Sequence, residues 1–84
     1  LTLAHENIVM SELLLTKDCK VIHHKIKDLH NMPANAIICC ILRKLQMIVP
    51  NGDTELLEQD KLLILSDSQT QDSVLSIFSQ GVSL

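Results

Sequence analysis

The amino-acid sequence predicts an α+β domain: a small antiparallel β-sheet with a short helical turn after its first strand and a C-terminal amphipathic helix packed on the sheet. Two patterns predict this class. Apolar segments of strand length recur along most of the chain, with turn signals between them. Apolar residues at helical spacing then appear near the C-terminal end. The 84 residues suit a single domain, which we expect to cover residues 6–80.

The first predicted strand covers residues 7–16, a mostly apolar run interrupted by two polar residues. Ile22, Ile26 and Leu29 follow at spacings of four and three, which predicts a short helical turn near residues 24–30. Pro33 ends this turn, because proline disfavours helix at the residue before it.

The second predicted strand, residues 36–43 (AIICCILR), is the strongest in the sequence. Its unbroken apolar run is typical of a strand that is covered on both faces. The C-terminal helix can cover one face. A further layer or a second subunit must cover the other, and so short a chain has little material for a layer, so we expect a homodimer.

Residues 46–49 are predicted to return as the hairpin partner of this strand, ending at Pro50, which cannot donate a ladder hydrogen bond. A turn signal, Asn51-Gly52-Asp53, leads to the last predicted strand at residues 61–66. The capping box Ser68-x-x-Gln71 then predicts a helix over residues 69–79.

Charge and composition argue against a nucleic-acid partner. The net charge is −3 and Phe78 is the single aromatic residue, so the chain lacks a basic surface and stacking rings. The first 50 residues hold six basic and four acidic side chains, whereas the last 34 hold one and six. An anionic ligand would therefore be better received by the first half.

Catalytic and metal sites are not predicted. His23 and His24 are adjacent, which disfavours one shared ion, and neither a CxxC nor an HxxxH spacing occurs. Cys39 and Cys40 lie in the apolar strand, where we expect buried and inert thiols rather than a nucleophile. The odd set of cysteines disfavours a disulfide framework and favours a cytoplasmic location.

The chain is not expected to insert in a membrane, because its longest apolar run is residues 36–42 and a spanning helix needs about 20. It begins at Leu1 rather than at methionine, so we expect a piece of a longer protein. Arg43 and Asp60, which flank two predicted strands, are expected to meet as a structural ion pair worth about 0 to 1 kcal/mol if exposed and more if shielded.

The stretches KIKDL and MPANAIICCILRKLQMIVPNGDTELLEQDKLLIL make the chain resemble the TrkA-C domain, the C-terminal module of regulators of potassium conductance (RCK). The resemblance runs across about residues 7–79. The matching positions are Lys25, Leu29, Arg43, Pro50, Gly52, Asp53, Thr54, Leu56 and Asp60. His24, Leu45 and Gln59 stand where the family often has glycine, so either these turns take other conformations or glycine is not required there.

The resemblance implies a cytoplasmic regulatory domain that senses a ligand, dimerises and is associated with a potassium or other cation channel or transporter. It implies no catalysis and no resident cofactor. It suggests a cyclic dinucleotide, cyclic di-AMP, as candidate effector in a cleft across the dimer. On this chain the expected ligand-binding residues are Lys25, Ile26, Lys27, Asn31, Asn35 and Pro50. The alternative is a purely structural dimerisation module without a ligand, and a small enzyme is the weakest reading.

Overall fold

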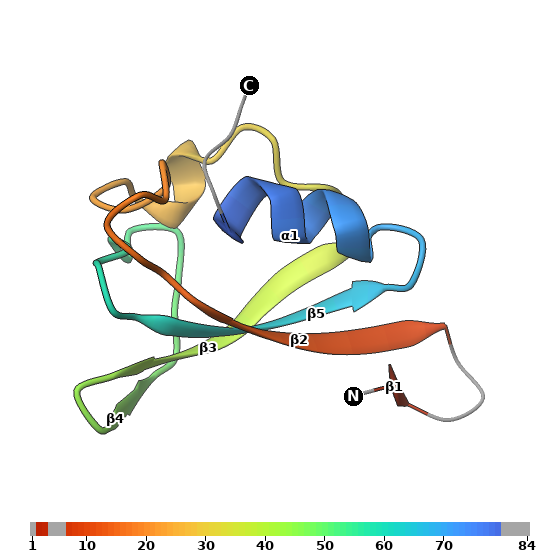
Figure 1. The fold of residues 1–84 in the computed structure, drawn as a ribbon, viewed down its shortest axis with the longest axis horizontal. Helices are drawn as coiled ribbons and strands as arrows, with labels where there is room; N and C mark the ends of the chain where they lie inside the picture. The colour runs from red at the N-terminus through yellow and green to blue at the C-terminus, as the bar shows by residue number, and fades with distance from the viewer. Residues whose placement is uncertain (1, 4–6, 80–84) are drawn as a thin grey trace.

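The computed structural model describes residues 2–3 and 7–79, which form an antiparallel five-stranded sheet and one main helix (Figure 1). The elements in chain order are β1 (Thr2–Leu3), β2 (Ile8–Leu14), the 3-10 turn η1 (Ile26–Asp28), β3 (Ala36–Arg43), β4 (Gln46–Ile48), β5 (Lys61–Asp67) and α1 (Gln71–Ser79). The spatial order of the strands is β1-β2-β5-β3-β4. The predicted fold class is therefore confirmed, and β1, a two-residue strand, is an addition.

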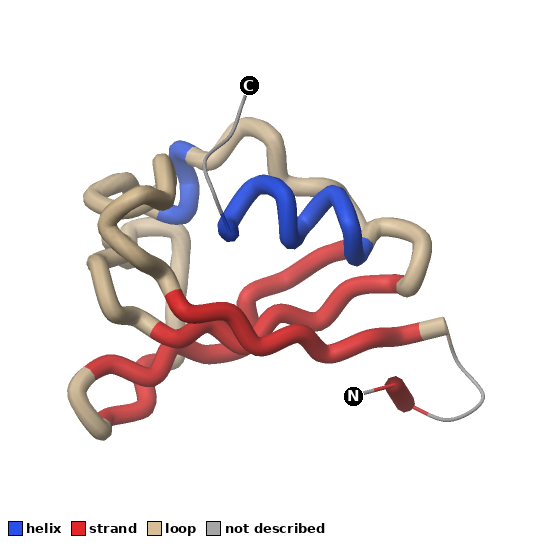
Figure 2. Tube along the Cα trace, in the orientation of Figure 1, coloured by secondary structure: helices blue, strands red, loops and turns tan. Residues whose placement is uncertain are grey.

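The helix, the 3-10 turn and most of the loops lie on one side of the sheet (Figures 1 and 2). Alternating residues of β5 point to that side and are buried, as the pattern of Leu62 and Ile64 shows. Val74 and Phe78 of α1 are completely buried against them. The apolar core therefore fills the space between α1 and this inner face of the sheet.

The opposite, outer face of the sheet has no described element over it (Figure 2). Ile37 is 60% exposed and Leu42 is 37% exposed, although both belong to the apolar strand β3. Within the described chain, only one face of β3 is therefore covered. The expectation that Cys39 is buried is wrong for this chain: a bulge between Ile38 and Cys40 leaves the Cys39 thiol exposed.

Three turns place residues other than glycine in left-handed backbone. Lys44 and Leu45 form a two-residue loop between β3 and β4, with φ of 50° and 68°. Positive φ at both positions is the geometry of a type I′ turn, which normally selects Gly or Asn. Gln59 has φ of 74°, and the left-handed residue of the third turn is His23 rather than His24. Leu45 and Gln59 therefore take the conformation that glycine would take without strain.

The N-terminus of α1 differs from the predicted capping box. Asp67, the last residue of β5, accepts hydrogen bonds from the Thr70 backbone at 2.8 Å and from the Thr70 hydroxyl. The Gln71 amide instead donates to the Ser11 hydroxyl of β2, at 3.4 Å. The first turn of α1 is thus tied to β5 by Asp67 and to β2 by Gln71.

Candidate functional site

The ion pair between Arg43 and Asp60 anchors the loop that forms the site. Arg43 Nε donates to Asp60 Oδ1 at 2.8 Å, and Arg43 Nη2 donates to Asp60 Oδ2 at 2.7 Å. The Asp60 side chain is 1% exposed, whereas that of Arg43 is 26% exposed. The hydrogen bond with Asp60 raises the pKa of the Arg43 guanidinium against the lowering effect of burial. The predicted structural pair is therefore present in its shielded form.

The same two residues hold the connection between β4 and β5. Arg43 Nη2 also donates to the Glu55 carbonyl at 2.8 Å, and the Leu57 backbone donates to Asp60 Oδ2 at 2.9 Å. A buried carboxylate with three donors is well satisfied, so it fixes this loop rather than acting as a free acid or base. The position of residues 51–57 is consequently set from the sheet.

Residues 51–56 run beside the segment that contains η1. The Ile26 backbone donates to the Thr54 carbonyl at 3.0 Å, and the Lys27 backbone donates to the Gly52 carbonyl at 2.9 Å. A β-bridge joins Lys25 to Glu55. Gly52 is so close to η1 that an added Cβ would lie 3.3 Å from Lys27 Cβ, a tight contact. Two segments distant in sequence thus form one unit.

This unit borders a depression of about 340 Å³ over the start of β3. Ile26 of η1 and Pro50 after β4, both predicted ligand residues, lie together in its wall. The sequence analysis missed the other lining residues, which are Leu29, Met32, Ala36, Ile37, Ile38, Asn51 and Gly52. Leu29 and Met32 could have been included because they follow Ile26 closely in the sequence. The sequence holds no comparable indication for Ile37. The depression has the apolar lining typical of small-molecule sites.

The predicted lysines lie outside this lining. Lys27 Nζ is 2.9 Å from Asp53 Oδ1 in an exposed ion pair, with side-chain exposures of 55% and 75%. Lys25 and Asn31 are also exposed. Lys25 and Lys27 are the chain neighbours of Ile26, which lines the depression, whereas Asn31 is not brought to it.

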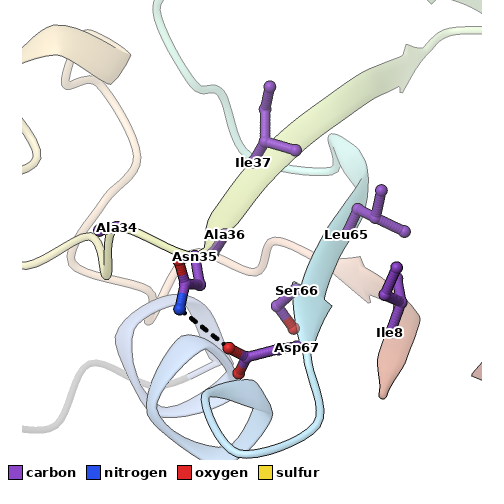
Figure 3. A pocket seen from close by; sticks show the side chains of 8 residues that line it. All are labelled: Ile8, Ala34, Asn35, Ala36, Ile37, Leu65, Ser66 and Asp67. Atoms are coloured by element: carbon purple, nitrogen blue, oxygen red, sulfur yellow. Dashed lines mark hydrogen bonds between the residues drawn. The ribbon is translucent and has the colours of Figure 1, made fainter. Parts of the chain in front are cut away.

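Asn35 lines a different depression, of about 320 Å³, at the beginning of β3 (Figure 3). Its amide donates to Asp67 Oδ2 at 2.9 Å, while Ile8, Ile37 and Leu65 point away from α1 on the outer side (Figure 3). The hydrogen bond from Thr70 lowers the pKa of Asp67, and Asn35 adds to that effect. Ile37 lines both depressions, so they adjoin on β3.

His23 Nδ1 is 3.6 Å from Glu55 Oε2, but no group of three or more metal-ligating side chains occurs among residues 2–3 and 7–79. In that same part no helix is long and apolar enough to cross a membrane.

The chain is similar to known proteins in sequence and in fold. The TrkA-C domain family matches residues 10–79. A solved structure described as "Structure of RCK domain with cda" is 23% identical, with a TM-score of 0.67, and the match covers 83% of this chain and 97% of that one. Another, "S. agalactiae BusR in complex with its busA-promotor DNA", is 17% identical with a TM-score of 0.73. That match covers 93% of this chain and 40% of BusR.

Proposed function

This chain belongs to the TrkA-C domain family, and on that basis we propose that it is a cytoplasmic, ligand-sensing dimerisation domain that regulates a potassium or other cation channel or transporter. The observation that carries the proposal is the depression beside η1, in which Ile26 and Pro50 meet. Both residues are ligand contacts that the sequence analysis predicts, as apolar surfaces that can pack against a base. The solved RCK domain described with cda, whose fold this chain shares, supports a small ligand.

The chemistry of the site favours an anion that carries flat apolar groups, and we propose cyclic di-AMP. Ile26, Pro50 and Ile37 offer an apolar surface against which a base can pack. Lys25 and Lys27, on either side of Ile26 in the chain, would meet a phosphate of the ligand. Lys27 would then exchange its exposed ion pair with Asp53 for a contact with that phosphate. Such an exposed pair contributes about 0 to 1 kcal/mol, so the exchange is inexpensive.

Ile37, which lines the site, is 60% exposed, so a second copy of the domain that covers Ile37 would complete the site. A ligand held by two subunits stabilises one relative arrangement of them. The attached transport protein would respond to that arrangement. The effector acts by population shift, and the domain itself carries no catalysis.

Thermal unfolding of the domain with and without cyclic di-AMP tests the proposal. A ligand that binds only the folded protein stabilises it, by about 2.7 kcal/mol at a free ligand concentration one hundred times Kd. The midpoint temperature of unfolding should therefore rise. Lys27→Glu should weaken binding about tenfold, whereas Lys17→Glu, with the same charge change on an exposed lysine outside the lining, should not. No shift at millimolar ligand would contradict the sensing role.

The alternative function is a purely structural dimerisation module. This alternative predicts a dimer whose thermal unfolding midpoint does not change when cyclic di-AMP is added. Binding that is unaffected by both Lys27→Glu and Ile26→Ser would keep the sensing role but contradict the site.

A further inference from the structure

The strand β4 forms one edge of the sheet, and within the described chain no strand lies beyond it (Figure 1). The loop between β3 and β4 has two residues, so Arg43 and Gln46 on either side of it form a hydrogen-bonded pair. The next pair, Leu42 and Met47, is then not hydrogen-bonded, and the Met47 N–H and C=O point away from β3. Two residues on, the Val49 N–H has no hydrogen bond among the described residues. The backbone of this edge is therefore open to a further strand.

Three large apolar side chains are exposed along the same edge. Leu45, Met47 and Val49 are 105%, 67% and 74% exposed, and residues 45–49 contain no charge. Proteins usually protect an edge strand with charged residues, a bulge or proline, because an open edge accepts other strands. Here Pro50 protects the end of the edge alone. We refer to residues 45–49 as the β4 edge.

Leu45 destabilises the isolated domain in two ways. Its φ of 68° is left-handed backbone, which glycine or asparagine takes with less strain. Its side chain is also fully exposed, so it gains nothing from burial within the chain. Backbone strain and exposed apolar surface are both typical of places where a partner binds. The two costs at Leu45 therefore indicate a binding surface.

We propose that the β4 edge binds an extended segment of a partner protein as an additional antiparallel strand. A strand can pair with the outward backbone groups of Met47 and Val49, whereas a helix uses its own backbone groups internally. Side chains alternate along a strand, so the partner segment carries apolar residues at alternating positions, opposite Val49, Met47 and Leu45. Lys44, which is in no ion pair among the described residues, precedes the edge and fits an acidic residue at the end of that segment.

This surface is separate from the depression of the proposed function, whose lining includes none of residues 45–49. The β4 edge therefore has its role whether or not the domain senses an effector. Met47 and Val49 together provide about four backbone hydrogen bonds to a partner strand. A free peptide must also be ordered on binding, so we expect a Kd on the order of 1 mM for a short peptide.

The test is a titration of the isotope-labelled wild-type chain followed by NMR. The probe is a seven-residue peptide with valine at its second, fourth and sixth positions, glutamate at its seventh and threonine elsewhere. The Met47 and Val49 amides should shift most. At about four times Kd they should exchange with solvent about fivefold more slowly, because about four fifths of the chains are then bound.

Two N-methylated peptides distinguish strand pairing from apolar contact. N-methylation at the second and fourth positions removes the donors that face β4 and should weaken binding about tenfold or more. N-methylation at the third and fifth positions, whose N–H groups point away from β4, is the matched control and should change the Kd less than about twofold. Lysine in place of the glutamate should weaken binding about twofold.

Leu45→Asn separates binding from stability. Asparagine suits the turn, so urea denaturation should show equal or higher stability, whereas the Kd of the peptide should rise about threefold or more. Leu14→Asn changes another exposed apolar residue, on β2, which two strands separate from β4. This control variant should bind the peptide as the wild-type chain does.

Three outcomes would overturn the proposal. The first is no change at the Met47 and Val49 amides with about 10 mM peptide, well above the expected Kd. The second is equal binding of the two N-methylated peptides, which would indicate apolar contact without strand pairing. The third is protection of the same amides that rises with protein concentration alone, which would assign the β4 edge to a second copy of the chain.

Discussion

Removing one partner of the Arg43 and Asp60 pair should destabilise the domain strongly, because the carboxylate is buried. Arg43→Ala deletes two charge-assisted hydrogen bonds to Asp60 and a third to the Glu55 carbonyl. The Asp60 carboxylate, 1% exposed, then keeps the Leu57 backbone N–H as its donor among the described residues. Breaking a buried pair costs about 3 to 5 kcal/mol. Because Arg43 is 26% exposed and water can replace part of it, we expect the lower end, about 3 kcal/mol.

Arg43→Lys keeps the charge but loses the two-point geometry, so its cost should be smaller, about 1 to 2 kcal/mol. A domain of this size has about 4 to 12 kcal/mol of stability, so these variants should remain folded. Urea denaturation followed by circular dichroism measures each variant. For the double variant with Asp60→Ala, we expect a coupling energy of at least about 1.5 kcal/mol. Single costs that add to within about 0.5 kcal/mol would refute the bracing role.

Three further predictions concern backbone strain, acid stability and one unsatisfied hydroxyl. Gln59→Gly and Leu45→Gly should each raise the free energy of unfolding by about 0.5 to 1 kcal/mol, since relief of left-handed strain exceeds the entropy cost of glycine; a loss in urea titrations would contradict it. The lowered pKa of Asp67 contributes stability above its unfolded value of 3.8 that is lost as the pH falls through the folded value. Asp67→Asn should therefore flatten the stability profile below about pH 4, and an unchanged acid limb would argue against this. Ser66 carries a buried hydroxyl that has no hydrogen-bond partner among the described residues, so Ser66→Ala should be neutral or stabilising by up to about 1 kcal/mol. A clear loss in thermal unfolding would show that the hydroxyl is satisfied.

The strands and the helix could be located from the sequence because the strands are apolar runs of strand length between turn signals and the helix has apolar residues at helical spacing. The predicted strand at residues 36–43 coincides with β3, Ala36–Arg43, and the last strand differs from β5 by one residue. The two-residue strand β1 has no period to detect. The bulge at Cys39 was also invisible, since a single extra residue inside an apolar run leaves no mark on the sequence.

The site was predictable only where a residue type restricts the backbone. Pro50 and Ile26, two of the predicted ligand residues, line the same depression, because proline and the apolar turn both restrict the backbone there. Asn35 was placed by its nearness in sequence, yet its amide is engaged with Asp67, 32 residues away. Such long-range hydrogen bonds depend on strand register, which the sequence of one strand does not contain.

Calorimetric titration of cyclic di-AMP into the wild-type domain, above its dimer Kd, tests the central claim most directly. The account predicts saturable binding at micromolar concentration or tighter, with one ligand for each two chains, because the site is completed by a second copy. Binding with one ligand per chain would contradict the shared cleft. The absence of heat and of any thermal shift at millimolar ligand would contradict the sensing function itself.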